Sequence, residues 1–233
     1  MSGPLVGAVR AALAAAGDPE RAIAQQAYMK SAMPYRGITA PELKRVLRPV
    51  LTDPALVPRT REAWETSVRA LWDEAAYREE RYAAIALTRH RVARPWQDVD
   101  TLGLYRHLVV TGAWWDLVDP VAGERVGAVL LTHRSGATPV LRGWATAEDL
   151  WLRRSAILAQ LGHREATDTG FLEEVLDANL EDSLHGREFF VRKAVGWALR
   201  QYARADPEWV RRYVASRGDR LAGLSRREAL KHL

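Results

Sequence analysis

A carboxylate and an indole ring stand at helical spacing in the segment Trp114–Asp119, which reads WWDLVD. If this segment is a helix, Trp115 and Asp119 lie four residues apart on one face, so a negative charge stands beside an electron-rich ring. This combination suits a positively charged ligand. Adjacent helical residues point about 100° apart, so we expect Trp114 to pack in the core and Trp115 to face the ligand.

Basic and aromatic side chains alternate on a second predicted helix face. Lys193 and Arg200 flank Trp197 at positions i−4 and i+3, as nucleic-acid binding would need. Arg154 follows a tryptophan by three residues, and we expect its guanidinium to be held for a phosphate. Each residue also has a structural alternative: Asp119 as a cap or ion-pair partner, Trp197 as a core residue and Arg154 as a solvated arginine.

The composition is that of a folded globular protein with a basic C-terminal part. With 233 residues, 48% of them hydrophobic and 27% charged, the chain can bury a substantial core, and we expect one domain over residues 1–233. Its net charge is +5, and residues 183–233 hold 12 basic against 5 acidic residues. This distribution is typical of a surface that contacts a phosphate backbone.

Several other function classes lack their residues in this sequence. The absence of cysteine excludes disulfides and thiolate metal sites, and the six histidines show no metal-ligand spacing. No HExxH, GxSxG, Walker or dinucleotide-binding motif occurs, so we expect no metal and no cofactor. The N-terminus has no secretory signal, and no apolar run approaches the roughly 20 residues that span a bilayer. We therefore expect a cytoplasmic protein.

Helical periodicity runs through nearly the whole chain and predicts an all-α fold. The Asp-Pro pairs at 18–19 and 206–207 combine a cap with a proline in the first turn, and Thr39 stands three residues before Glu42 in a capping box. Gly136 is expected to end a helix. The predicted helices cover residues 4–16, 19–31, 41–51, 59–72, 77–90, 99–111, 115–132, 138–145, 149–161, 170–179, 187–204, 207–216 and 225–231.

These helices group into pairs of roughly 35 to 45 residues, the period of HEAT and armadillo repeats. We therefore expect a curved solenoid of HEAT-like antiparallel helix pairs with a concave groove that binds DNA. A compact helical bundle is the competing fold.

Six stretches, in this order and spacing, resemble the bacterial DNA alkylation-repair glycosylases that are built from HEAT-like repeats. The resemblance runs almost from end to end of the chain. The stretches are Tyr28-Met29-Lys30, Gly37-Ile38 followed by Pro41, WWDLVD at 114–119, WLRRSAIL at 151–158, EFFVRKAVGWALRQYA at 188–203 and LSRREALKHL at 224–233.

The resemblance implies a monofunctional glycosylase that hydrolyses the N-glycosidic bond of cationic alkylpurines in duplex DNA. N7-methylguanine and N3-methyladenine are the implied substrates, with bulkier adducts as a further class. The target base would not be buried in a pocket, unlike in base-flipping glycosylases. By similarity, Asp119 is the catalytic carboxylate, and Trp115 and Trp197 frame the deoxyribose of the lesion.

The resemblance also implies a set of DNA contacts. Tyr28 resembles the third aromatic residue at the lesion, and Arg154 resembles an arginine that binds the DNA backbone. Thr39 and Pro41 would pack against the opposite strand. Lys30 is assigned to the same DNA-binding set, and we expect the protein to act as a monomer.

The chemistry of the lesion agrees with this assignment independently. An alkylated purine is already a cationic leaving group, so catalysis has only to stabilise positive charge on the sugar or to orient water, and a fixed carboxylate can do either. Two alternatives stay open. One is a non-catalytic helical-repeat module that binds DNA or a protein. The other, less favoured, is a sugar-cleaving enzyme that uses Asp116 with Asp119, because carboxylates three residues apart on one helix seldom flank a glycosidic bond.

Overall fold

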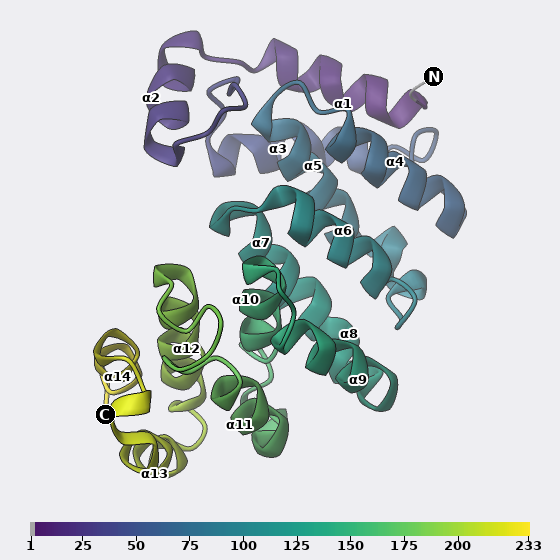
Figure 1. Ribbon diagram of the computed structural model, residues 1–233. Helices are drawn as coiled ribbons and strands as arrows, with labels where there is room; N and C mark the ends of the chain where they lie inside the picture. The colour runs from purple at the N-terminus through teal and green to yellow at the C-terminus, as the bar shows by residue number, and fades with distance from the viewer. Residues whose placement is uncertain (1–2) are drawn as a thin grey trace. The chain divides into compact units, whose positions relative to one another are not determined.

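The computed structural model describes residues 3–233, and this part of the chain is built from 14 α-helices without any β-strand (Figure 1). The all-α prediction is therefore confirmed. The chain divides into two compact units, which we call unit 1 (up to Trp96) and unit 2 (Gln97–Leu233). The single domain expected over residues 1–233 stays a prediction. None of the described helices is both long and apolar enough to cross a bilayer.

Unit 1 has a core of leucine, valine and tryptophan side chains. Helix α1 buries one apolar stripe against α3, α4 and α5, as its spacing of four residues dictates: Leu5, Val9 and Leu13. The elements of unit 1 are α1 (Pro4–Ala15), α2 (Pro19–Met29), α3 (Ala40–Thr52), α4 (Arg61–Asp73), α5 (Arg78–Arg89) and the 3₁₀ helix η1 (Arg91–Trp96).

A buried carboxylate fixes the connection between α2 and α3. Glu79 on α5 is fully buried and accepts hydrogen bonds of 2.9–3.2 Å from the backbone N–H groups of residues 36–38. Gly37 has φ of +83°, and a Cβ there would come within 2.0 Å of the Asp18 carbonyl oxygen, so only glycine fits. This connection delivers the chain to Thr39, the N-cap of α3.

Unit 2 contains the longer part of the fold. Helix α10 packs on α6, α7, α9, α11 and α12, and α12 packs extensively on α14. The elements of unit 2 are α6 (Leu102–Gly112), α7 (Trp115–Pro120), the π-helix η2 (Val121–Val126), α8 (Gly127–Thr132), α9 (Arg134–Ala145), α10 (Leu150–Leu158), η3 (Arg164–Ala166), α11 (Thr169–Asp177), α12 (Phe189–Tyr202), α13 (Pro207–Arg217), η4 (Gly218–Arg220) and α14 (Gly223–Ala229).

Two of the predicted helices of unit 2 differ from the structure. The segment predicted as one helix over 115–132 is helical but carries a π-helical section after Pro120, whose nitrogen has no hydrogen to donate to the α-helical ladder. The stop predicted at Gly136 is wrong, because α9 begins at Arg134 and Gly136 lies inside it. A Cβ at Gly136 would come within 2.8 Å of the Val99 side chain, so this glycine permits close packing.

Candidate active site

One cleft in unit 2 brings together most of the residues that the sequence singled out. We call it the unit 2 cleft, and its volume is about 400 Å³. Four helices of unit 2 contribute to it, α7, α10, α12 and α14. Its lining residues are Trp115, Asp119, Arg154, Phe189, Phe190, Lys193, Trp197, Arg200 and Glu228.

Helix α7 presents Trp115 and Asp119 to the cleft together. The intervening Leu117 and Val118 are fully buried and anchor the helix, so the opposite face carries the indole and the carboxylate. Trp115 is 37% exposed, whereas the Asp119 side chain is only 15% exposed. The shared face that the sequence predicted is therefore present, with the carboxylate at the more sheltered position.

The neighbouring Trp114 points away from Trp115 into an aromatic cluster. Its ring centroid lies 5.3 Å from that of Phe190 and 6.2 Å from that of Trp151, and the last two rings are 5.0 Å apart. Trp115 faces the cleft as predicted, whereas Trp114 packs in this cluster but is half-buried and does not belong to the fully buried core. Trp151 lies on α10 and Phe190 on α12, so the cluster joins these two helices and fixes the position of Phe190, which also lines the cleft.

Asp119 is held by a buried, bidentate ion pair with Arg154 of α10. The Nε and Nη2 atoms of Arg154 donate to Oδ1 and Oδ2 of Asp119 over 2.7 and 2.8 Å, and Nη1 donates to the Phe190 carbonyl oxygen. The Arg154 side chain is 5% exposed. Three of its five N–H groups are thus engaged, and a phosphate contact by Arg154, which stays a prediction, would have to use the remaining two.

The electrostatic environment of Asp119 contains two opposing influences. Burial raises the pKa of the Asp119 carboxyl above its ordinary value, and the charge of Asp116 adds to this effect. The hydrogen bonds and positive charge of Arg154 act in the opposite direction. The net direction is upward, so this carboxyl takes up a proton at a higher pH than an exposed aspartate.

Helix α12 places Lys193, Trp197 and Arg200 along the cleft, at the spacing the sequence predicted. Both cations contact Glu228 of α14: the Lys193 Nζ atom lies 3.1 Å from Oε2, and Arg200 pairs with Oε1. Glu228 is largely buried. The predicted arrangement of cations around Trp197 is present, but an acidic partner neutralises part of their charge.

Gly196 on α12 allows α14, which carries Glu228, to pack closely against α12. A Cβ at Gly196 would come within 2.7 Å of the Glu228 Cβ and 3.0 Å of the Ser225 Cα. The Ser225 hydroxyl also donates to the Arg192 carbonyl oxygen over 2.8 Å. Three lining residues, Phe189, Phe190 and Glu228, were not predicted as site residues from the sequence; the only signal was that they lie inside stretches that resemble the repair glycosylases.

The remaining predicted residues belong to unit 1. Tyr28 is 78% exposed near the end of α2, and Lys30, also exposed, is the left-handed C-cap of this helix with φ of 50°. The backbone N–H of Thr39 donates to the Glu42 carboxylate over 2.9 Å, which confirms the capping box, and Pro41 is exposed in the first turn of α3. Across residues 3–233, no three His, Asp or Glu side chains gather as a metal site would require.

The chain is similar to known DNA alkylation repair enzymes in sequence and in fold. The family model for DNA alkylation repair enzymes matches residues 9–233. A solved structure described as a predicted DNA alkylation repair enzyme from Enterococcus faecalis is similar in fold, with a TM-score of 0.77 and 29% sequence identity. The similarity covers 93% of this chain and 96% of that one. A comparison with curated proteins gave no match.

Proposed function

Since the chain belongs to the DNA alkylation repair enzyme family, we propose that it is a monofunctional DNA glycosylase that removes cationic alkylpurines from duplex DNA. N7-methylguanine and N3-methyladenine are the primary substrates, and bulkier adducts are a further class. One observation carries the proposal: the Asp119 carboxylate lines a cleft beside two indole rings and is fixed there by Arg154.

The reaction needs little more than a fixed negative charge. The N-glycosidic bond breaks, its electron pair neutralises the cationic purine, and positive charge grows on the sugar until water adds to C1′ and loses a proton. Asp119 would stabilise that charge or orient the water. At about 4 Å and an effective dielectric near 20, opposite unit charges attract by on the order of 4 kcal/mol, which corresponds to several hundred-fold in rate.

Arg154 acts in this scheme as a positioning residue. Both carboxylate oxygens accept from one rigid guanidinium, which fixes the rotamer of Asp119. Each oxygen keeps lone-pair capacity for a further partner. The ion pair therefore orients the carboxylate and reduces its net field at the same time.

Trp115 and Trp197 supply flat, electron-rich surfaces at the same cleft. An indole face attracts a cation by roughly 0.5 to 2 kcal/mol, depending on how well water is excluded. The cationic sugar and the cationic base both benefit from such surfaces. We propose that these two residues flank the deoxyribose of the lesion.

DNA binding would use cations of both units. Lys193 and Arg200 lie along the cleft, and we assign them to the phosphate backbone, with Glu228 as their partner before DNA arrives. In unit 1 the proposed contacts are Tyr28 and Lys30, together with Thr39 and Pro41 at the start of α3. The protein would act as a monomer without a metal or cofactor.

The decisive experiment is to incubate the purified chain with methylated duplex DNA and measure free 7-methylguanine by liquid chromatography with mass detection. We expect base release and a matching number of abasic sites, with no strand cleavage. If the protein shifts this DNA in a gel with strong salt dependence but releases no base, the non-catalytic binding module is correct and the glycosylase is wrong.

A further inference from the structure

Unit 1 contains a second cavity, of about 430 Å³, that is separate in sequence from every residue assigned above. We call it the unit 1 pocket. Its basic side chains come from the end of α5 and from η1: His90, Arg91 and Arg94. Its apolar walls include Pro54 and Val57 of the connection between α3 and α4, together with Val92.

The 3₁₀ geometry of η1 directs the two arginines to the same side. A 3₁₀ helix has three residues per turn, so the side chains at positions i and i+3, here Arg91 and Arg94, eclipse one another. Both are exposed, and within residues 3–233 neither meets a carboxylate. Asp53, which lies between the lining residues Thr52 and Pro54 in the sequence, does not itself line the pocket, and its Oδ1 atom accepts from the Ala55 backbone N–H over 2.8 Å.

His90 adds a neutral hydrogen-bond donor to this pair. Its Nδ1 atom accepts from the Val92 backbone N–H over 3.4 Å, an arrangement that leaves the proton on Nε2. Burial, together with the nearby charge of Arg91, lowers the pKa of His90. The lowered pKa favours the neutral imidazole, with Nε2–H as the donor that remains.

Two unneutralised guanidinium groups and an imidazole N–H define the chemistry of the ligand. Planar guanidinium groups bind phosphate oxygens in a bidentate manner, and no acidic side chain lines the pocket to compete with an anion. The volume exceeds what a lone phosphate fills and lies within the range of roughly 300 to 1,000 Å³ that small-molecule sites occupy. The apolar walls favour a ligand with an uncharged, flat part attached to its phosphate.

We propose that the unit 1 pocket binds a nucleotide, with its phosphate on Arg91 and Arg94 and its nucleoside against the apolar walls. The nucleotide is either free or part of a DNA strand; both present the same phosphate and nucleoside. This site uses no residue of the unit 2 cleft and does not depend on glycosylase chemistry.

The test follows the imidazole NMR signal of His90, assigned with a His90→Gln variant, during titration of the full chain with dGMP, inorganic phosphate or a short single-stranded DNA. We expect dGMP or the DNA to shift this signal saturably, and phosphate to bind at least about tenfold more weakly, since it makes no apolar contact. The variant R91Q/R94Q should lose about tenfold or more in affinity, because two charge-assisted contacts disappear.

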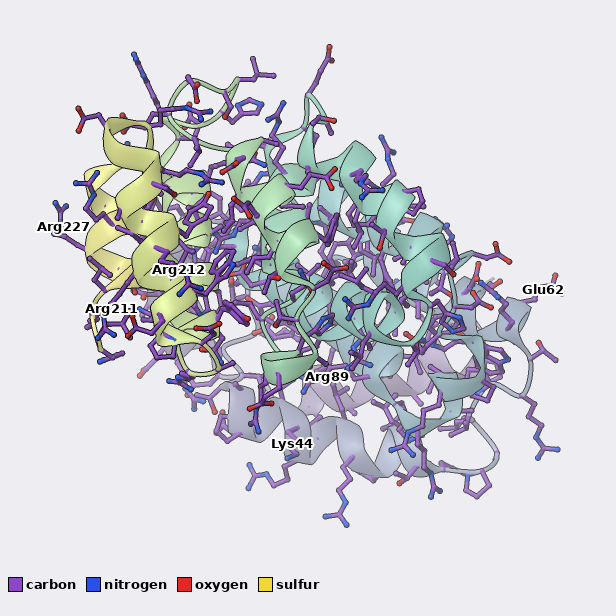
Figure 2. The ribbon with its side chains drawn as sticks, turned by 90° about the horizontal axis from the view of Figure 1, so that it is seen from below. Lys44, Glu62, Arg89, Arg211, Arg212 and Arg227 are labelled. Carbon is purple, nitrogen blue, oxygen red and sulfur yellow. The ribbon has the colours of Figure 1, made fainter. Side chains whose placement is uncertain are left out.

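The matched control is K44Q/R45Q, which removes the same charge from exposed residues of α3 that line neither cavity; Lys44 is labelled in Figure 2. Its affinity should equal that of the wild type.

A dGMP response that depends on the arginine pair identifies a free nucleotide, and a response to DNA alone identifies a strand. If no ligand shifts the His90 signal, if phosphate binds as tightly as whichever of dGMP and DNA responds, or if both double variants bind alike, the proposal is overturned. Base release from methylated DNA is measured in parallel, so its failure leaves a positive nucleotide result intact.

Discussion

Replacing Asp119 by asparagine removes the negative charge of the unit 2 cleft while keeping the size of the side chain. At about 4 Å, the carboxylate attracts the growing sugar cation by on the order of 4 kcal/mol at an effective dielectric near 20. The Arg154 charge lies about 4 Å farther away and repels it by on the order of 2 kcal/mol. The wild-type pair is thus net attractive, whereas D119N leaves only the repulsion.

The expected loss in D119N is therefore on the order of 4 kcal/mol, or several hundred-fold to a thousandfold in the rate of base release. The double variant D119N/R154Q removes the repulsion as well and should recover on the order of 2 kcal/mol, about thirtyfold. The single variant also leaves a buried guanidinium without its partner, which destabilises a protein by about 3–5 kcal/mol. Its folded fraction must be measured by circular dichroism before rates are compared.

The assay is single-turnover release of 7-methylguanine from one duplex, with enzyme in excess over DNA. Asp116→Asn is the matched control, because Asp116 lies on the same helix but does not line the cleft, and its rate should stay within about threefold of the wild type. Wild-type rates in D119N would refute the catalytic role. A double variant slower than D119N would refute the electrostatic reasoning.

Three further results are expected. Burial raises the pKa of Asp119, and the ionised carboxylate is the active form. As the pH is lowered, base release should therefore begin to fall while the pH is still above about 3.9, the ordinary pKa of aspartate. A rate that stays constant down to pH 4 contradicts this. Glu228→Gln should free Lys193 and Arg200 from their ion pairs, so duplex DNA should bind more tightly. The slope of log affinity against log salt concentration should then steepen by up to about 1.8, and an unchanged slope in a binding titration contradicts this. Glu79→Gln should lower the free energy of unfolding by about 2–3 kcal/mol, because three backbone N–H groups lose their charged acceptor. Urea unfolding measures this change, and an unchanged urea midpoint contradicts the role of this carboxylate.

Local spacing distinguished Lys193 and Arg200 from other basic residues of unit 2, because these two cations flank Trp197 on one predicted helix face. Arg211, Arg212 and Arg227 lie exposed on α13 and α14 (Figure 2), although they belong to the same basic C-terminal part as Lys193 and Arg200. Charge along the sequence identified the basic region. The packing of α12 against α14 added what the sequence did not predict, which is that Glu228 pairs with both Lys193 and Arg200.

Features that depend on neighbours in the chain were predictable from the sequence. Helical periodicity gave the all-α class, and the side chain of Asp18 caps α2 as its position before a proline indicated. The common face of Trp115 and Asp119 follows from the same local geometry, since helix pitch alone sets residues four apart side by side. Gly136 was misjudged because its role is to accept the Val99 side chain, a contact across 37 positions.

The sequence by itself therefore determined the helices, their caps and the faces on which aromatic and charged side chains stand, because these follow from backbone geometry within a few residues. Only the tertiary structure decided that Arg154 pairs with Asp119 across 35 positions and that Glu228 lies between the cations of α12. Such partners are set by which helices pack together, and that choice depends on the summed burial of many side chains rather than on any one motif.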